Sequence, residues 1–184
     1  RLGPYCKSEW NPFLFLGHNL ITHLGCYRTA LVRELGGFRI GYEGAQDYDL
    51  AARMAERLAP ADIVHIPRIL YHWRVIPGST AGGPGEKSYA LAASEKAINE
   101  HLVRQNLPAT ATGIAALGMH QIRFQLPPDP PLVSILIPTK NRIDLLRACI
   151  SSIVSKTSYP RYEILVIDNG SDCPETLSYL NELI

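Results

Sequence analysis

The sequence has almost no net charge. Across 184 positions, 18 Lys and Arg residues stand against 17 Asp and Glu residues, which gives a formal net charge of +1. Because neither sign forms a long run, the chain lacks the basic surface that binds nucleic acid or an anionic membrane. It also lacks the roughly 18 consecutive apolar residues of a membrane-spanning helix, and residues 1–10 lack the apolar core of a secretory signal. The expected location is therefore the cytoplasm, with peripheral attachment to the inner face of the cell membrane left open.

Cysteine is also scarce, with four residues and no C-x-x-C pair. Irregular spacing of this kind is typical of free thiols in a reducing compartment. The six histidines form no H-E-x-x-H or C2H2 pattern, which argues against a zinc site. Hydrophobic residues make up 46% of the chain, enough for a core, and the length permits either one domain or two smaller ones.

Two clusters of helix- and strand-breaking residues divide the chain. Residues 126–131 contain four prolines, and residues 77–85 consist of Pro, Gly, Ser, Thr and Ala. We therefore expect three parts: residues 1–81, a helical linker with a proline-rich end over 82–131, and residues 132–184.

Regular elements are fewer in the first two parts. Apolar residues spaced by three and four predict a helix over 47–58, and a second helix is expected over 86–106. Residues 19–22 and 65–71 are strand candidates, the latter with a proline inside it. The stretch that follows the second helix, from Pro108 to Gln125, is weakly patterned and is interpreted as a spacer or bracing element.

The third part has the clearest pattern. Residues 132–137 and 162–167 are apolar runs of strand length, and apolar residues at helical spacing lie between them over 143–154. This order predicts a β-α-β unit with parallel strands and a right-handed crossover, and hence an α/β fold. The loops 138–142 and 168–172 then leave the same carboxyl edge of the sheet, where α/β proteins bind ligands.

The two loops contain neither G-x-G-x-x-G nor G-x-x-x-x-G-K-[ST], which excludes a dinucleotide fingerprint and a P-loop. They do contain charged and polar side chains. Lys140 and Arg142 can meet phosphate groups, whereas Asp168 and Asn169 can pair with a nucleobase edge or a ribose hydroxyl.

A structural interpretation of the neighbouring polar residues stays open. Asn141 can cap the helix that follows it, and Asp172 can cap a helix that starts at Pro174, with Glu175 completing a capping box. For Asp172 we favour the cap.

Residues 134–142 and 164–172 strongly resemble the opening of family 2 glycosyltransferases, which have the GT-A fold. The resemblance implies that Asp168 closes the nucleotide pocket of a nucleotide-sugar donor, and that three residues of the first loop line it: Pro138, Thr139 and Arg142. Many members carry a second acidic residue where this chain has Asn169, so the resemblance leaves the nucleobase open.

Residues 35–39 and 44–50 resemble a later segment of the same family, in which a Gly-Gly-Phe turn precedes an acidic pair at a helix start. The pair is Gln46-Asp47 here. The resemblance implies that Asp47 is the catalytic base, which takes the proton of the acceptor hydroxyl in an inverting transfer. Alternatively, Asp47 is a carboxylate favoured by the helix dipole, and both roles can hold. We favour the base.

Residues 71–80 resemble the segment that closes such a domain, where a His or Arg approaches the donor diphosphate or its metal ion. His72 is the candidate metal ligand, with a packed histidine as the alternative. Trp73 can stack on a sugar or simply pack, and we favour packing. His18 and His23 are interpreted as structural.

The two resemblances occur in reversed order, since the end of one domain precedes the start of another. We therefore expect a fragment of a tandem protein. The family implies a divalent cation, Mn²⁺ or Mg²⁺, held by a D-x-D motif that is not present in this chain in the required context. Asp47-Tyr48-Asp49 matches the D-x-D pattern, but its sequence context is not that of the metal-binding motif.

The expected function is thus an inverting glycosyltransferase that takes a nucleotide-diphosphate sugar and a saccharide or lipid-linked saccharide acceptor, in bacterial surface polysaccharide or O-antigen biosynthesis. The alternative is a non-catalytic nucleotide-binding or interaction module. A third possibility is that the two halves pack into one permuted domain or exchange between chains, because sheet edges would otherwise remain unpaired.

Overall fold

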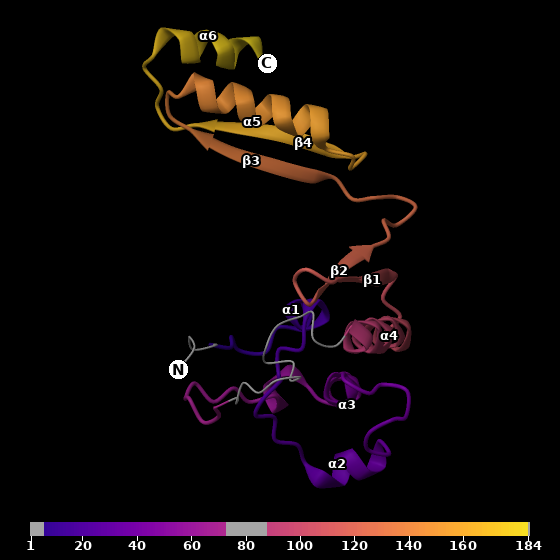
Figure 1. Ribbon diagram of the computed structural model, residues 1–184. Coiled ribbons are helices and arrows are strands. Elements are labelled where there is room, and N and C mark those ends of the chain that lie inside the picture. Colours follow the sequence, from indigo (N-terminus) through magenta and orange to yellow (C-terminus); the bar gives the residue numbers. More distant parts are fainter. Residues whose placement is uncertain (1–5, 73–87, 184) are drawn as a thin grey trace. The chain divides into compact units, whose positions relative to one another are not determined.

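The computed structural model describes residues 6–72 and 88–183. The chain divides into two compact units, Arg1–Gln125 and Leu126–Ile184, and each is described by itself (Figure 1). The division coincides with the start of the proline-rich segment. The domain boundaries at residues 81 and 131 stay predictions.

The first unit is mainly helical. The helix predicted from Asp47 is confirmed, although it ends three residues earlier than Leu58, and the helix predicted over 86–106 is confirmed over Ser88–Arg104. The elements of this unit are α1 (Pro12–Gly17), α2 (Thr29–Glu34), α3 (Gln46–Ala55), the 3₁₀ turn η1 (Pro60–Asp62), α4 (Ser88–Arg104), β1 (Ala109–Ile114) and β2 (Met119–Phe124).

Both strand predictions in this unit are wrong. Residues 19–22 form a turn, because the side-chain oxygen of Asn19 accepts hydrogen bonds from the backbone N–H groups of Ile21 and Thr22. An Asn side chain of this kind competes with strand pairing. Residues 65–71 contain Pro67 and join no sheet. Apolar character alone therefore did not identify the strands of this unit.

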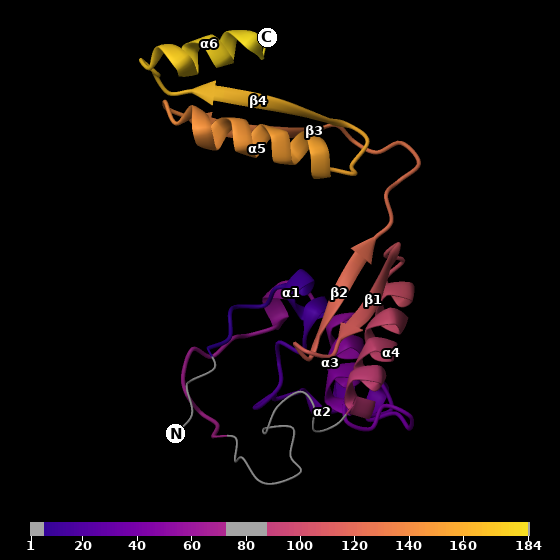
Figure 2. The same ribbon diagram turned by 45° about the horizontal axis from the view of Figure 1, so that its top comes forward.

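An antiparallel hairpin occupies the stretch interpreted as a spacer. Strands β1 and β2 pair with Ala111 opposite Ile122, and the turn between them ends at Gly118, whose φ is +61°. The outer edge of β1 is closed by α4, which runs alongside it (Figure 2). The Asn99 amide donates to the carbonyl of Ala111 and accepts from its N–H, both at 2.9 Å. The hairpin is thus an integral part of the first unit.

The core of the first unit lies between α1, α3, α4 and the hairpin. Helix α4 contributes buried residues at positions 94, 97, 98, 101 and 102, which is the spacing of one helical face. Ring contacts join Phe15 of α1 to Tyr48 of α3, with centroids 5.0 Å apart. The buried cluster comprises Phe15, Leu16, Leu20, Ala45, Tyr48, Ala51, Ala52, Ile98, Leu102 and Ala111.

The second unit confirms the predicted β-α-β topology and the α/β class. Strands β3 (Val133–Thr139) and β4 (Tyr162–Asp168) pair in parallel, and α5 (Ile143–Lys156) connects them. Helix α6 (Pro174–Glu182) follows and lies beside α5. Both strands end together, because Thr139 is paired with Asp168.

The two capping predictions are wrong. Helix α5 has Arg142 at its N-cap, and α6 has Cys173 there, and neither receives a side-chain cap hydrogen bond. Asn141 and Asp172 are instead linked to each other across the two loops, at 3.0 Å. Long-range pairing of polar side chains therefore replaces the local caps.

Candidate functional site

Asp47 is the second residue of α3 and is partly exposed. The Nδ2 atom of Asn19 donates a hydrogen bond to its Oδ2 at 3.0 Å. The other end of the Asn19 amide is held by two backbone N–H groups, those of Ile21 at 3.2 Å and Thr22 at 3.1 Å. The amide therefore has one orientation, and that orientation directs its NH₂ group at the carboxylate.

The Gly36-Gly37 turn fixes the chain before α3. Gly37 N donates to Val32 O at 2.9 Å and Gly36 N to Arg33 O at 3.1 Å, the pattern of a Schellman motif at the end of α2. The motif requires a left-handed residue, and Gly36 has φ of +78°. Arg53 of α3 then donates to the carbonyl of Gly37 at 2.6 Å. The turn is thus attached to the helix that carries Asp47.

Asp49 is a structural residue. Its carboxylate is fully buried and accepts hydrogen bonds from Arg53 at 2.8 Å and 3.0 Å and from two guanidinium nitrogens of Arg39. Burial by itself would raise the pKa of Asp49, but the bonds from Arg39 and Arg53 outweigh it, so the pKa lies below its usual value. Because both oxygens are engaged, Asp47 and Asp49 do not form a metal-binding pair.

The charge of Asp47 also acts on the phenol of Tyr27. Burial raises the pKa of its phenol to about 12, and the negative charge of Asp47 adds to the increase. The phenol thus remains neutral at physiological pH beside a carboxylate. Sequence reasoning missed both Tyr27 and Asn19, since no local pattern links them to position 47.

His72 is exposed and lies outside the helices and strands. Over residues 6–72 and 88–183, no group of three or more His, Cys, Asp or Glu side chains could hold a metal ion. The metal role of His72 therefore stays a prediction, and Trp73 lies outside the described residues. His23 stacks on Tyr71, with centroids 5.4 Å apart, and burial lowers the pKa of His18, in keeping with structural roles for both.

In the second unit, the ends of β3 and β4 bring the predicted nucleotide residues together. Thr139 and Asp168 are register partners, as are Pro138 and Ile167. The N–H of Asn169 donates to the carbonyl of Thr139 at 2.8 Å, which extends the ladder by one bond. Pro138, Asp168 and Asn169 are exposed at this edge, and Thr139 is partly buried.

Arg142 also lies at this edge, with its side chain exposed. Its guanidinium donates to both carboxylate oxygens of Asp144, at 3.1 Å and 2.9 Å. The bond to Asp144 raises the pKa of Arg142 above its usual value. An exposed ion pair of this kind is weak, and a phosphate can displace the carboxylate.

A hydrogen-bond network joins the two loops at the same edge. Ser171 donates its hydroxyl to Asp168 at 2.5 Å and accepts the backbone N–H of Asn141 at 2.7 Å. The side chain of Asn141 contacts Asp172 and Cys173. Sequence reasoning placed these residues in the right loops but did not predict that they bind one another.

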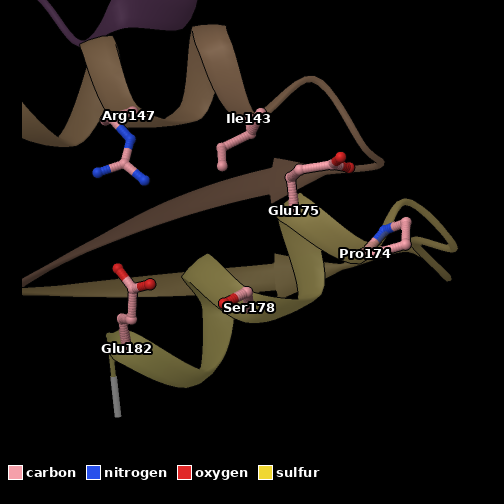
Figure 3. Close-up of a pocket in the computed structure, with 6 residues that line it drawn as sticks. All are labelled: Ile143, Arg147, Pro174, Glu175, Ser178 and Glu182. Atoms are coloured by element: carbon pink, nitrogen blue, oxygen red, sulfur yellow. The ribbon is translucent and has the colours of Figure 1, made fainter.

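A shallow hollow lies between α5 and α6 (Figure 3). Arg147 of α5 lies over the Tyr179 ring of α6, 4.2 Å from its centroid. The hollow contains none of the residues predicted to bind the nucleotide. Its lining consists of Ile143, Arg147, Pro174, Glu175, Ser178 and Glu182.

A parallel β-α-β unit with polar loops at one carboxyl edge is typical of α/β proteins that bind their ligand there. Residues 134–184 match the family described as Glycosyl transferase family 2. No solved structure gives a significant match to the chain.

Three curated relatives cover different shares of the chain. It is 40% identical over 183 residues to the uncharacterized protein y4gI of Sinorhizobium fredii and 34% identical over 184 residues to the O-antigen biosynthesis protein RfbC of Myxococcus xanthus. Both alignments cover 100% of this chain, but only 20% and 14% of the two relatives. Glycosyltransferase AglE of Haloferax volcanii is 44% identical over 43 residues, or 22% of this chain and 14% of that protein.

Within the described parts of the chain, none of the helices combines the length and apolar character needed to cross a membrane.

Proposed function

We propose that this chain is part of an inverting glycosyltransferase of surface polysaccharide or O-antigen biosynthesis. The observation that carries the proposal is the family match over residues 134–184, which coincides with the β-α-β unit and its two polar loops. The similarity of the whole chain to an O-antigen biosynthesis protein supports the pathway class. The tandem arrangement remains part of the proposal.

The carboxyl edge of β3 and β4 binds the nucleotide of a nucleotide-diphosphate sugar. Asp168 accepts hydrogen bonds from the base or ribose, Asn169 accepts or donates them, and Pro138 and Thr139 line the pocket beside them. Arg142 turns from Asp144 to a phosphate. Adjacency of the two strand ends and the exposure of these side chains support this assignment.

Asp47 acts as the general base in the first unit. Its carboxylate accepts the proton of an acceptor hydroxyl while that oxygen forms a bond to the anomeric carbon. The bond from the anomeric carbon to the diphosphate oxygen breaks at the same time, and the nucleoside diphosphate leaves with the electron pair. The configuration at the anomeric carbon is therefore inverted. Partial exposure of Asp47 and its fixed contact with Asn19 support the role.

A divalent cation, Mn²⁺ or Mg²⁺, belongs to the proposal as the ion that neutralises the donor diphosphate. The described ranges supply no group that could hold it, and Asp49 is committed to Arg39 and Arg53. His72 is proposed to meet the diphosphate or its cation, on the strength of its exposed position.

The acceptor is a saccharide or a lipid-linked saccharide, and the proposed location is the cytoplasm or the inner face of the cell membrane. A second candidate function is a non-catalytic nucleotide-binding module. The observation that favours it is that Asp47 and the nucleotide residues belong to different compact units. Self-association through open sheet edges also remains proposed. It would involve β3 and β4, each of which has one edge without a paired strand in the described residues, whereas Asn99 occupies the outer edge of β1.

Calorimetry with UDP, GDP, CDP and dTDP, each with and without Mg²⁺ or Mn²⁺, tests the nucleotide site. We expect one nucleotide to bind and Asp168→Ala to weaken its binding strongly, whereas Glu163→Gln, a change at an exposed position of the same strand away from the edge, leaves the affinity unchanged. Failure of all four nucleotides to bind would refute the site.

A transfer assay on the protein that carries this sequence separates the two functions. Asp47→Asn is expected to lower kcat by about 10²–10⁴-fold, the usual contribution of a general base, with donor affinity unchanged. Sugar transfer by Asp47→Asn at the wild-type rate would refute the assignment of Asp47 as the base. Nucleotide binding by the wild-type protein without any transfer would establish the non-catalytic alternative.

A further inference from the structure

Asn141 connects the two loops at the carboxyl edge by both its side chain and its backbone. Its Oδ1 atom accepts from the backbone N–H of Asp172 at 3.1 Å and of Cys173 at 3.0 Å, and its Nδ2 donates to Oδ1 of Asp172 at 3.0 Å. Its own backbone N–H donates to the Ser171 hydroxyl at 2.7 Å. One residue of the first loop thus makes four hydrogen bonds to three consecutive residues of the second.

The network continues to a residue of the proposed nucleotide site. The Ser171 hydroxyl donates to Oδ1 of Asp168 at 2.5 Å, and the Ser171 N–H lies 3.1 Å and 3.2 Å from the two carboxylate oxygens. The Thr139 hydroxyl donates to the carbonyl of Asn141 at 3.2 Å. The position of the Asp168 carboxylate therefore depends, through Ser171, on the conformation of Asn141.

Neither of two simpler roles accounts for these contacts. Asn141 does not cap α5, whose N-cap is Arg142. It is also not needed to pair the strands, because the β3–β4 ladder runs from Val133 to Thr139 before Asn141 is reached. What Asn141 adds is a link between two loops that are otherwise joined only at the strand ends.

We propose that Asn141 is a positioning residue that locks the two loops into the nucleotide-binding arrangement before the nucleotide arrives. This inference rests on the proposed nucleotide site. Because the loops are already ordered, binding does not have to supply the free energy of ordering them, and affinity is higher. The backbone of Asn141 has φ of +54°, a left-handed conformation that Asn tolerates better than most residues.

Three variants test the link with little change to the backbone. Asn141→Gly removes the side-chain bonds and suits the positive φ. Asn141→Asp keeps an acceptor for the two N–H groups but places a carboxylate against Asp172. The double variant Asn141→Asp/Asp172→Asn restores the side-chain bond with its direction reversed, and so serves as the rescue.

Nucleotide affinity is measured by calorimetry on the whole chain with the nucleoside diphosphate that the wild-type chain binds, starting with UDP. We expect Asn141→Gly and Asn141→Asp to weaken binding by about tenfold or more, the effect of losing roughly one hydrogen bond, and the double variant to recover most of the loss. Hydrogen exchange of the peptide over residues 169–175 is expected to accelerate in both single variants and to return in the double variant.

A double-mutant cycle separates positioning from a general effect on folding. In the Asp168→Ala background, Asn141→Gly should weaken residual binding far less than it does in the wild type, because the group that it positions is gone. Equal losses in both backgrounds, or wild-type affinity of Asn141→Gly, would overturn the inference and leave the nucleotide site standing. If no nucleoside diphosphate binds to the wild-type chain, the site and the inference are both wrong.

Discussion

The side-chain amide of Asn19 contacts the carboxylate of Asp47 at 3.0 Å, although 28 positions separate the two residues. The turn that Asn19 makes with Ile21 and Thr22 sets the direction of this amide. The contact holds one carboxylate oxygen of the proposed base in place. The loop after α1 and the start of α3 thus together position the proposed catalytic base.

Substitution of Asn19 should affect catalysis more than folding. Asn19→Asp keeps the side-chain oxygen that accepts from Ile21 and Thr22, but it replaces the NH₂ group by an oxygen that repels Asp47. We expect kcat for sugar transfer to fall by about tenfold or more, with the KM for the donor unchanged, because a hydrogen bond to a charged group contributes roughly 1.5–3 kcal/mol. Steady-state kinetics on the protein that carries this sequence measures it.

The same substitution has an internal control. In the Asp47→Asn background the repulsion is absent, so Asn19→Asp should cause little further loss of kcat. A full loss there would show that Asn19 acts on folding or on another group.

Asp49 should be essential for stability. Asp49→Ala leaves Arg53 buried without its carboxylate, and breaking a buried ion pair in this way costs about 3–5 kcal/mol. Urea unfolding followed by circular dichroism measures the loss. Asp47→Asn is the matched control on the same helix and should cost less than about 1 kcal/mol, the scale of a helix-dipole interaction. Similar losses in the two variants would contradict the assignment of Asp49 as structural.

Stability should fall in acid. Burial raises the pKa of Glu56, but hydrogen bonds from His101 and Arg104 outweigh it, so the pKa lies below the usual 4.5, and that of Asp49 lies below 3.8. The folded chain therefore binds fewer protons than the unfolded chain below these values, and the free energy of unfolding decreases as the pH falls.

Urea midpoints measured from pH 7 to pH 3 check this dependence. We expect a plateau near neutrality and a decline that is steepest below about pH 4.5, the usual pKa of Glu56. Burial also lowers the pKa of His120 from its usual 6.5, so the free energy of unfolding begins a shallower decline below about pH 6.5. Glu56→Gln should reduce the acid slope, and a profile that rises toward pH 3 would refute the prediction.

Gly44 should tolerate no side chain. A Cβ atom at Gly44 would lie 2.8 Å from the Cβ of Ala90 and 2.8 Å from the Tyr89 ring, and its φ is +86°. Gly36 also has a positive φ, +78°, but nothing lies within 4 Å of a Cβ there. Gly44→Ala should therefore cost about 1–3 kcal/mol more than Gly36→Ala, the usual cost of overpacking. Equal urea midpoints for the two variants would contradict the close approach of α4.

Periodicity predicted some elements well and missed others. The apolar runs that became β3 and β4 are continuous, as is typical of strands in parallel β-α-β units, and their pairing needed only the intervening helix. The hairpin of β1 and β2 was not predicted, because its buried positions include small and polar residues such as Ala111 and His120. Those positions are buried because α4 packs against β1 and α1 packs against β2.

The sequence by itself determined the β-α-β unit, the helix that begins beside Asp47, and the placement of Pro138, Thr139, Asp168 and Asn169 at one sheet edge. These features follow from local spacing, which acts over a few residues. Only the tertiary structure decided that Asn19 contacts Asp47, that Asn141 binds Ser171 and Asp172, and that Asp49 is buried between two arginines. Such contacts depend on which side chains the fold brings together and buries, because polar groups that leave water must find a partner wherever the fold places one.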